Sequence, residues 1–160
     1  GIAVPLLLER LGVRTVKQYY CEPDGHFAHN PEPLPENLGF ISAEIENGNF
    51  DLGIVVDPDV DRLCFINQDG TFFGEEYTLV AVAKYVLENK KGNTVSNLSS
   101  TRALRDVTEK LGGEYHASAV GEVNVVTKMK EVNAVIGGEG NGGVIYPELH
   151  YGRDALVGIA

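Results

Sequence analysis

Apolar residues along this chain recur at helical spacing in some segments and form short runs in others. Residues 3–11 carry apolar side chains every three or four positions and end at Gly12, which predicts a helix. The short run "FDLGIVV" at 50–56 favours a strand. The same criteria predict further helices at 38–47, 75–88, 101–111, 121–129 and from 153 onward, and further strands at 13–20, 62–66, 94–98, 114–118 and 134–137.

The alternation of strands and helices predicts an α/β fold. We expect two three-layer α/β/α units with mixed, largely parallel sheets. The segments "LERLGVRTVKQYY" and "TEKLGGEYHASAV" both read as helix, glycine stop and strand, and each precedes a strand that ends in an acidic loop. This loose repeat predicts two related α/β units with a boundary near Asp69–Gly74.

Composition and charge exclude some classes of partner. The 160 residues are 43% hydrophobic and carry a formal net charge of −10, which argues against binding to a nucleic-acid backbone. No run approaches the roughly 18 apolar residues of a membrane span, so no membrane partner and a cytoplasmic location are expected. The start, "GIAVPLLLERLG", lies inside a helical pattern without a Met, which suggests a fragment of a longer chain.

The strand at 50–56 runs directly into three carboxylates at alternate positions, Asp57, Asp59 and Asp61, with Arg62 beside them. Ligands of α/β sheets sit at the carboxyl ends of strands. Three adjacent carboxylates repel one another unless a cation neutralises them, and Mg²⁺ prefers such oxygen ligands. The pattern fails as an EF-hand, which needs Gly and Glu at its sixth and twelfth positions. A solvated acidic turn and a dehalogenase-type phosphatase with Asp57 as nucleophile remain alternatives.

A second motif, "GGEGNGG" at 137–143, lies downstream, preceded by "VGEVNVV". "DPDVDR" resembles the metal-binding loop of the α-D-phosphohexomutases, the phosphoglucomutase/phosphomannomutase superfamily. "GGEGNGG" resembles that family's sugar-binding loop in its third domain, and the order and separation of the motifs also fit. The resemblance covers the whole chain, as the later part of domain two (1–70) and domain three (71–160).

The resemblance implies a reaction and a set of ligands. Family members move phosphate between the 1- and 6-positions of a hexose through an enzyme phosphoserine and a bisphosphate intermediate. Carried onto this chain, Asp57, Asp59 and Asp61 would hold Mg²⁺ together with a phosphoserine oxygen. Arg62 would help to offset charge on the transferring phosphoryl group as a catalytic residue. Glu139 and Asn141 would accept and donate hydrogen bonds to the hydroxyls of a hexose phosphate substrate.

Further substrate contacts are implied less directly. Glu122 stands where several members have His or Asp. Arg102 follows a strand and could meet a phosphate, although a solvated helix arginine is the alternative. Many members have His where this chain has Gly143.

The serine loop of the family is not found in this sequence. "FAHNP" at 27–31 is similar to that loop but lacks its serine. The resemblance therefore implies that domains one and four of the same chain are missing and that the fragment is inactive alone. A non-catalytic module that binds sugar phosphate or metal is the alternative function.

Overall fold

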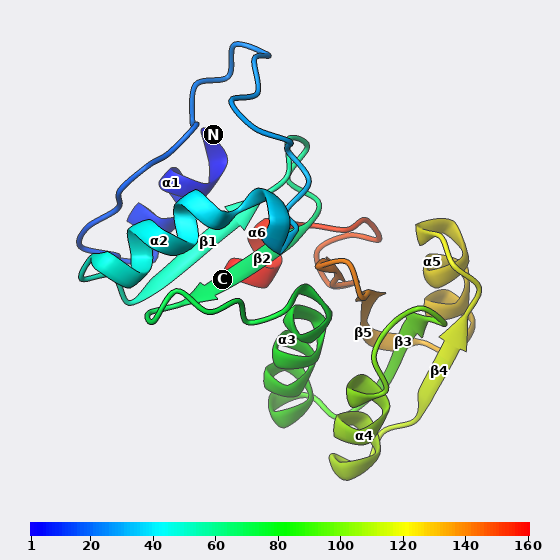
Figure 1. The fold of residues 1–160 in the computed structure, drawn as a ribbon. Coiled ribbons are helices and arrows are strands. Elements are labelled where there is room, and N and C mark those ends of the chain that lie inside the picture. Colours follow the sequence, from blue (N-terminus) through cyan, green and yellow to red (C-terminus); the bar gives the residue numbers. More distant parts are fainter.

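The computed structural model describes residues 1–160 as a two-stranded hairpin with its helices, followed by a four-stranded sheet (Figure 1). The elements are α1 (Ala3–Arg10), the 3₁₀ turn η1 (Pro35–Asn37), α2 (Gly39–Asn47), β1 (Leu52–Val56), β2 (Leu63–Asn67), α3 (Glu75–Asn89), β3 (Asn93–Asn97), α4 (Ala103–Lys110), β4 (Tyr115–Ser118), α5 (Glu122–Glu131), β5 (Ala134–Glu139), β6 (Gly143–Ile145) and α6 (Ala155–Ile159). The predicted α/β fold with mixed sheets is confirmed.

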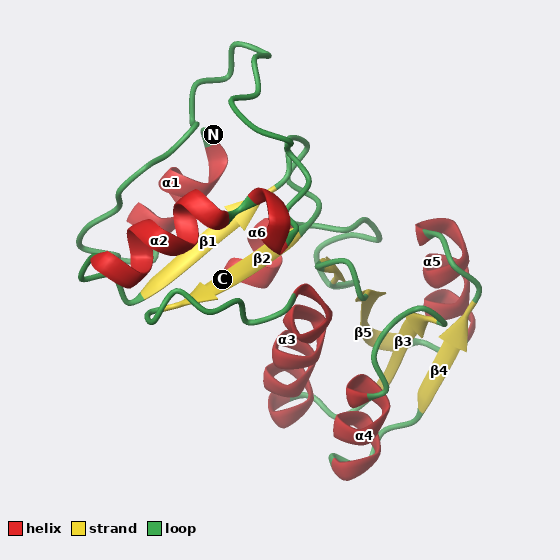
Figure 2. Ribbon diagram, viewed as in Figure 1, coloured by secondary structure: helices red, strands yellow, loops and turns green.

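The first sheet is an antiparallel pair, β1 and β2, in which Val56 lies opposite Leu63. Helix α2 lies along this hairpin (Figure 2) and buries Ile45 against it. Gly53 allows this approach, because a Cβ there would come within 2.2 Å of the Ile45 Cδ1 atom. Parallel pairing is therefore confined to the second sheet.

The predicted strand at 13–20 is wrong. This segment has no regular structure, and Val13 and Val16 are exposed. Its apolar alternation resembles that of a strand, but none of the strands in this chain pairs with it. A strand forms only where a neighbour accepts its backbone hydrogen bonds.

The second sheet has the strand order β4-β3-β5-β6, with β3 parallel to β4 and to β5, and β6 antiparallel to β5. Two apolar clusters hold three layers together. On one face, α3 and α4 supply Leu79, Ala83 and Leu104. On the other face, α5 supplies Val125 and Met129. The carboxyl ends of β3 and β5 consequently lie side by side.

The two sheets touch where β2 meets the turn between β5 and β6. The Leu63 N–H donates to the Gly142 carbonyl at 3.1 Å. Gly142 has φ +88°, and a Cβ there would lie 2.3 Å from the Leu63 carbonyl oxygen, so only glycine fits this contact. Helix α6 packs against both β2 and β6. None of the helices is long and apolar enough to cross a membrane.

Candidate functional site

The acidic loop is the connection between β1 and β2, and Asp57 organises its backbone. One carboxylate oxygen of Asp57 accepts the N–H groups of Asp61 and Arg62, both at 3.0 Å. Val60 adopts φ 61°, a left-handed conformation that costs a β-branched residue about 1–3 kcal/mol. Its carbonyl is held by the Ala155 N–H at 3.0 Å. The surrounding structure thus maintains a strained turn in the middle of the acidic loop.

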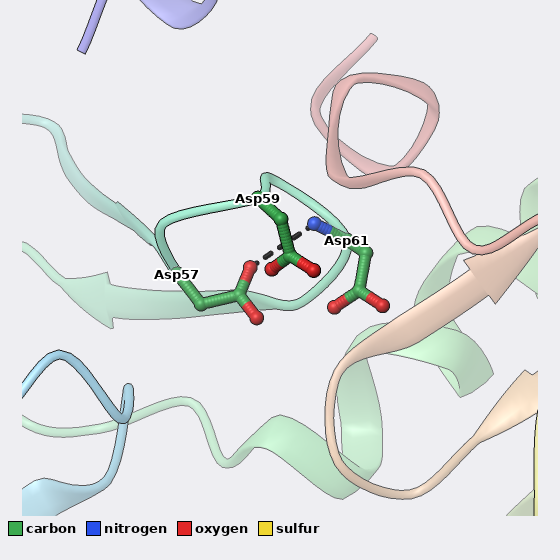
Figure 3. Close-up of side chains that lie close together, drawn as sticks. All are labelled: Asp57, Asp59 and Asp61. Atoms are coloured by element: carbon green, nitrogen blue, oxygen red, sulfur yellow. Dashed lines mark hydrogen bonds between the residues drawn. The ribbon is translucent and has the colours of Figure 1, made fainter. Parts of the chain in front are cut away.

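The three aspartates converge as the sequence predicts (Figure 3). One carboxylate oxygen from each of Asp57, Asp59 and Asp61 lies within 4.8 Å of the others. Asp59 is exposed, whereas the Asp61 Oδ1 atom is buried and has no hydrogen-bond partner. An unpartnered buried carboxylate oxygen is costly, and a bound cation would satisfy it. The donor set, carboxylate oxygens alone, fits a hard divalent cation.

Asp57 and Asp61 are perturbed in opposite directions. Burial acts to raise the pKa of Asp57, but the hydrogen bonds from Arg62 outweigh it and hold that pKa below its usual value. Burial raises the pKa of Asp61 to about 6, with the charges of Asp57 and Asp59 acting in the same direction and that of Arg153 opposing. Asp61 is therefore the carboxylate that gains most from a neutralising cation.

The Arg62 side chain is clamped between two carboxylates. Its Nε donates to the Asp57 Oδ2 atom at 2.7 Å, and its two terminal nitrogens donate to the Glu32 oxygens at 2.5 and 3.0 Å. Glu32 comes from the proline-rich loop 22–39, and its hydrogen bonds with Arg62 lower its pKa. Two of the five guanidinium N–H groups stay available for a ligand.

These contacts disfavour Asp57 as a nucleophile. Its side chain is 1% exposed, its Oδ1 atom accepts two backbone N–H groups and its Oδ2 atom accepts from Arg62. A carboxylate oxygen has about two acceptor positions, so only Oδ2 keeps one lone pair. That single position suits a metal ligand better than an attacking group.

The glycine-rich motif is a β-hairpin, not the open loop that its composition suggests. Glu139 ends β5, and its side chain is only 6% exposed. One of its oxygens accepts from the Asn97 side-chain amide at 2.7 Å and from the Gly121 N–H at 3.3 Å. Asn141 is exposed at the turn, where its Oδ1 atom accepts the Gly143 N–H at 3.3 Å.

Arg153 connects the acidic loop to this hairpin. Its two terminal nitrogens donate to Asp61 and, at 2.9 Å, to the Glu139 Oε2 atom. Its Nε lies 3.5 Å from a Glu122 oxygen, and its backbone N–H donates to the other Glu122 oxygen at 3.1 Å. Asp61, Glu139 and Glu122 therefore meet around one guanidinium.

Arg102 lies outside this network. Its side chain is 79% exposed and pairs with Asp106 at 3.1 Å, as a solvated helix arginine does. It lines a separate, open hollow of about 220 Å³ together with Arg105 and Tyr115. A role for Arg102 in substrate binding stays a prediction.

The sequence analysis did not predict the contacts that three residues make with the site. Asn97 ends β3 beside Glu139, and the rule that ligands sit at the carboxyl ends of strands could have found it. Arg153 lies 92 residues from Asp61, and nothing in the sequence signals their contact. Glu32 likewise lies in a loop with no local signal for its pairing with Arg62.

Two family models match this chain. Residues 1–70 match "Phosphoglucomutase/phosphomannomutase, alpha/beta/alpha domain II", and residues 74–160 match the corresponding alpha/beta/alpha domain III.

Individual proteins show the same similarity. The chain is 37% identical over 98% of its length to a phosphoglucomutase/phosphomannomutase of Thermococcus kodakarensis. It is 34% identical over its full length to a protein of Methanopyrus kandleri named probable phosphoglucosamine mutase. It spans about a third of these relatives, namely 35% and 36% of their lengths. A crystal structure of a phosphoglucomutase/phosphomannomutase family protein from Burkholderia thailandensis matches 81% of this chain and 29% of its own, with 30% identity and a TM-score of 0.73.

Proposed function

The chain belongs to the phosphoglucomutase/phosphomannomutase family, and from this premise we propose that it supplies the metal-binding and sugar-binding halves of a phosphohexomutase active site. The reaction would interconvert a hexose 1-phosphate and a hexose 6-phosphate through an enzyme phosphoserine and a bisphosphate intermediate. The observation that carries the proposal is the guanidinium of Arg153, which contacts both Asp61 and Glu139.

In this proposal Asp57, Asp59 and Asp61 hold Mg²⁺. The ion would supply positive charge next to the phosphoryl group during transfer. Asp57 keeps the loop closed through its backbone contacts and offers its remaining lone pair, while Asp61 offers its unpartnered oxygen. Asp59 is exposed and would complete the set without giving up another contact.

Arg62 would act on the phosphoryl group with the guanidinium N–H groups that Asp57 and Glu32 leave unused. Its clamp fixes the plane of the guanidinium, so the donors are oriented before the substrate arrives. The same clamp implies that Arg62→Lys would be damaging, because a lysine offers one compact charge in place of a planar fork.

On the sugar side, Glu139 and Asn141 would hydrogen-bond hydroxyl groups of the hexose. Asn97, Gly121 and Arg153 hold the Glu139 carboxylate in one orientation, and one acceptor position on its Oε2 atom stays free for a hydroxyl group. Asn141 is exposed at the turn and is accessible to a ligand. Glu122, at the start of α5 and paired with Arg153, would face the same substrate.

We also propose that residues 1–70 are the later part of domain two and that residues 71–160 are domain three. Domains one and four of the full protein would then supply the phosphoserine and the second phosphate site. The names of the relatives include glucose, mannose and glucosamine enzymes, so the proposal extends to the class of hexose phosphates.

The test is a coupled mutase assay with glucose 1-phosphate and a hexose bisphosphate activator. These 160 residues alone should show no turnover, because they hold no serine in a "TASHNP"-like loop. A full-length protein that contains this segment should be active and should lose at least ~100-fold in kcat on Asp59→Ala. Turnover by the isolated chain, or full activity of the Asp59→Ala protein, would contradict the proposal.

A further inference from the structure

Among the side chains, Arg153 alone hydrogen-bonds to both the acidic loop, residues 57–62, and the glycine hairpin, residues 137–145. Its guanidinium binds Asp61 on one side and Glu139 on the other, and its side chain is 19% exposed. Three carboxylates around a single cation, two of them largely buried, leave this cluster with excess negative charge.

The position of Arg153 is fixed by its neighbours in the chain. The next residue, Asp154, donates its N–H to the Val144 carbonyl at 2.8 Å and caps α6 with its side chain. Ala155 donates its N–H to the Val60 carbonyl in the acidic loop. The backbone that follows the arginine is thus attached to both motifs, so the guanidinium has little freedom to move away from them.

The aliphatic part of the Arg153 side chain also explains why residue 143 is a glycine. A Cβ on Gly143 would lie 2.4 Å from the Arg153 Cδ atom, so the arginine occupies the space that a side chain at 143 would need. Gly143 is not among the residues with positive φ, and its backbone therefore tolerates alanine. An alanine there should push the arginine stem aside without removing its charge.

We infer that Arg153 is a positioning residue that couples metal occupancy at Asp61 to the orientation of Glu139. This inference rests on the proposed metal site. Arg153 binds the Oδ2 atom of Asp61, while the Oδ1 atom accepts no hydrogen bond and lies 3.7 Å from the Arg62 Nε, so a metal ion on Oδ1 and the arginine would share one carboxylate. A bound metal ion partly neutralises Asp61 and so weakens its electrostatic attraction for the Arg153 guanidinium. The ion pair between Arg153 and Glu139 becomes stronger as a result. By reciprocity, a ligand on Glu139 changes metal affinity by the same factor.

The experiment is an NMR titration of the isotope-labelled chain with MgCl₂ at neutral pH, which detects weak binding. Backbone amides of Asp61 and Arg62 report the acidic loop, and the side-chain carboxylate carbon of Glu139 reports the hairpin. In the wild-type chain both should shift with one midpoint, while the carboxylate of the exposed Glu88 stays unchanged.

Three substitutions distinguish coupling through Arg153 from coupling by other routes. Arg153→Met keeps the apolar stem and removes the charge, so the Glu139 shift should vanish while the loop amides still respond. Arg153→Lys restores the positive charge and should recover part of the Glu139 shift. Gly143→Ala, which keeps the charge but displaces the stem, should reduce the Glu139 shift by at least half. Dispersed amide spectra of each variant confirm that it is folded.

The outcomes distinguish this inference from the function it rests on. A Glu139 shift that persists in Arg153→Met would place the coupling in the Leu63–Gly142 backbone contact and overturn the role of Arg153. The role of Arg153 would also be overturned if, in the wild type, the loop amide resonances shift with Mg²⁺ while the Glu139 carboxylate resonance does not. Loop amides that do not respond to Mg²⁺ at all would instead refute the metal assignment, and the inference with it.

Discussion

Replacing Asp61 by asparagine should stabilise the metal-free protein and abolish its stabilisation by Mg²⁺. Burial raises the pKa of Asp61 to about 6, so the folded chain binds a proton at this site more tightly than the unfolded chain does. Stability from this group is fully present below its unfolded pKa and is lost as the pH rises through about 6. The asparagine side chain mimics the protonated aspartate at every pH and avoids this loss.

The magnitude follows from the pKa difference. The pKa of Asp61 rises from 3.8 to about 6 and its side chain is 19% exposed, which corresponds to at most about 3 kcal/mol at neutral pH. The free energy of unfolding of the Asp61→Asn chain should thus exceed that of the wild type by up to about 3 kcal/mol at pH 7.5 in chelator, and by less than about 1 kcal/mol near pH 4. With Mg²⁺, only the wild type gains stability, in proportion to the logarithm of ligand concentration over Kd.

The assay is urea unfolding followed by circular dichroism at pH 4 to 8, with EDTA or with MgCl₂. Asp59→Asn is the matched control: it removes a carboxylate from the same loop, but Asp59 is exposed, so metal-free stability should hardly change while the Mg²⁺ effect is lost. The reasoning is refuted if Asp61→Asn is less stable than the wild type at pH 7.5 in EDTA, or if its advantage does not shrink towards pH 4.

Two further substitutions and a labelling result are expected. Gly142→Ala should cost about 3 kcal/mol or more in urea unfolding, because φ is +88° and the new Cβ would meet the Leu63 carbonyl at 2.3 Å. Gly12→Ala is its control, since φ is +83° with nothing within 4 Å, and should cost about 1 kcal/mol; equal losses would contradict the contact argument. Burial raises the pKa of the Cys64 thiol to about 11, so a thiol reagent at pH 8 should label the half-buried Cys21 first, and equal rates would count against the buried position.

The local pattern of apolar residues predicted those helices and strands that bury one face against another element of the fold. Helix α3 and strands β3, β4 and β5 lie within two residues of the expected bounds, because their periodicity reflects packing into the two apolar clusters. The segment 13–20 carries a similar apolar pattern yet forms no strand, since strand propensity depends on a neighbour that the pattern does not contain.

The candidate site also has a part that the sequence predicts and a part that it does not. The aspartate loop was predictable because Asp57, Asp59 and Asp61 are close in the sequence, and a turn brings them together. The contacts of Arg153 were not predictable, because they join segments 92 and 14 residues apart in the sequence. Such contacts follow from how β2 packs against the β5–β6 hairpin, and no local sequence pattern encodes that packing.

The most direct measurement of the central claim is anomalous diffraction from crystals of this chain grown with Mn²⁺, a hard-ligand substitute for Mg²⁺. We expect one peak bonded to a carboxylate oxygen from each of Asp57, Asp59 and Asp61, including the Oδ1 atom of Asp61. A well-ordered acidic loop without that peak, or an ion held by other residues, would contradict it.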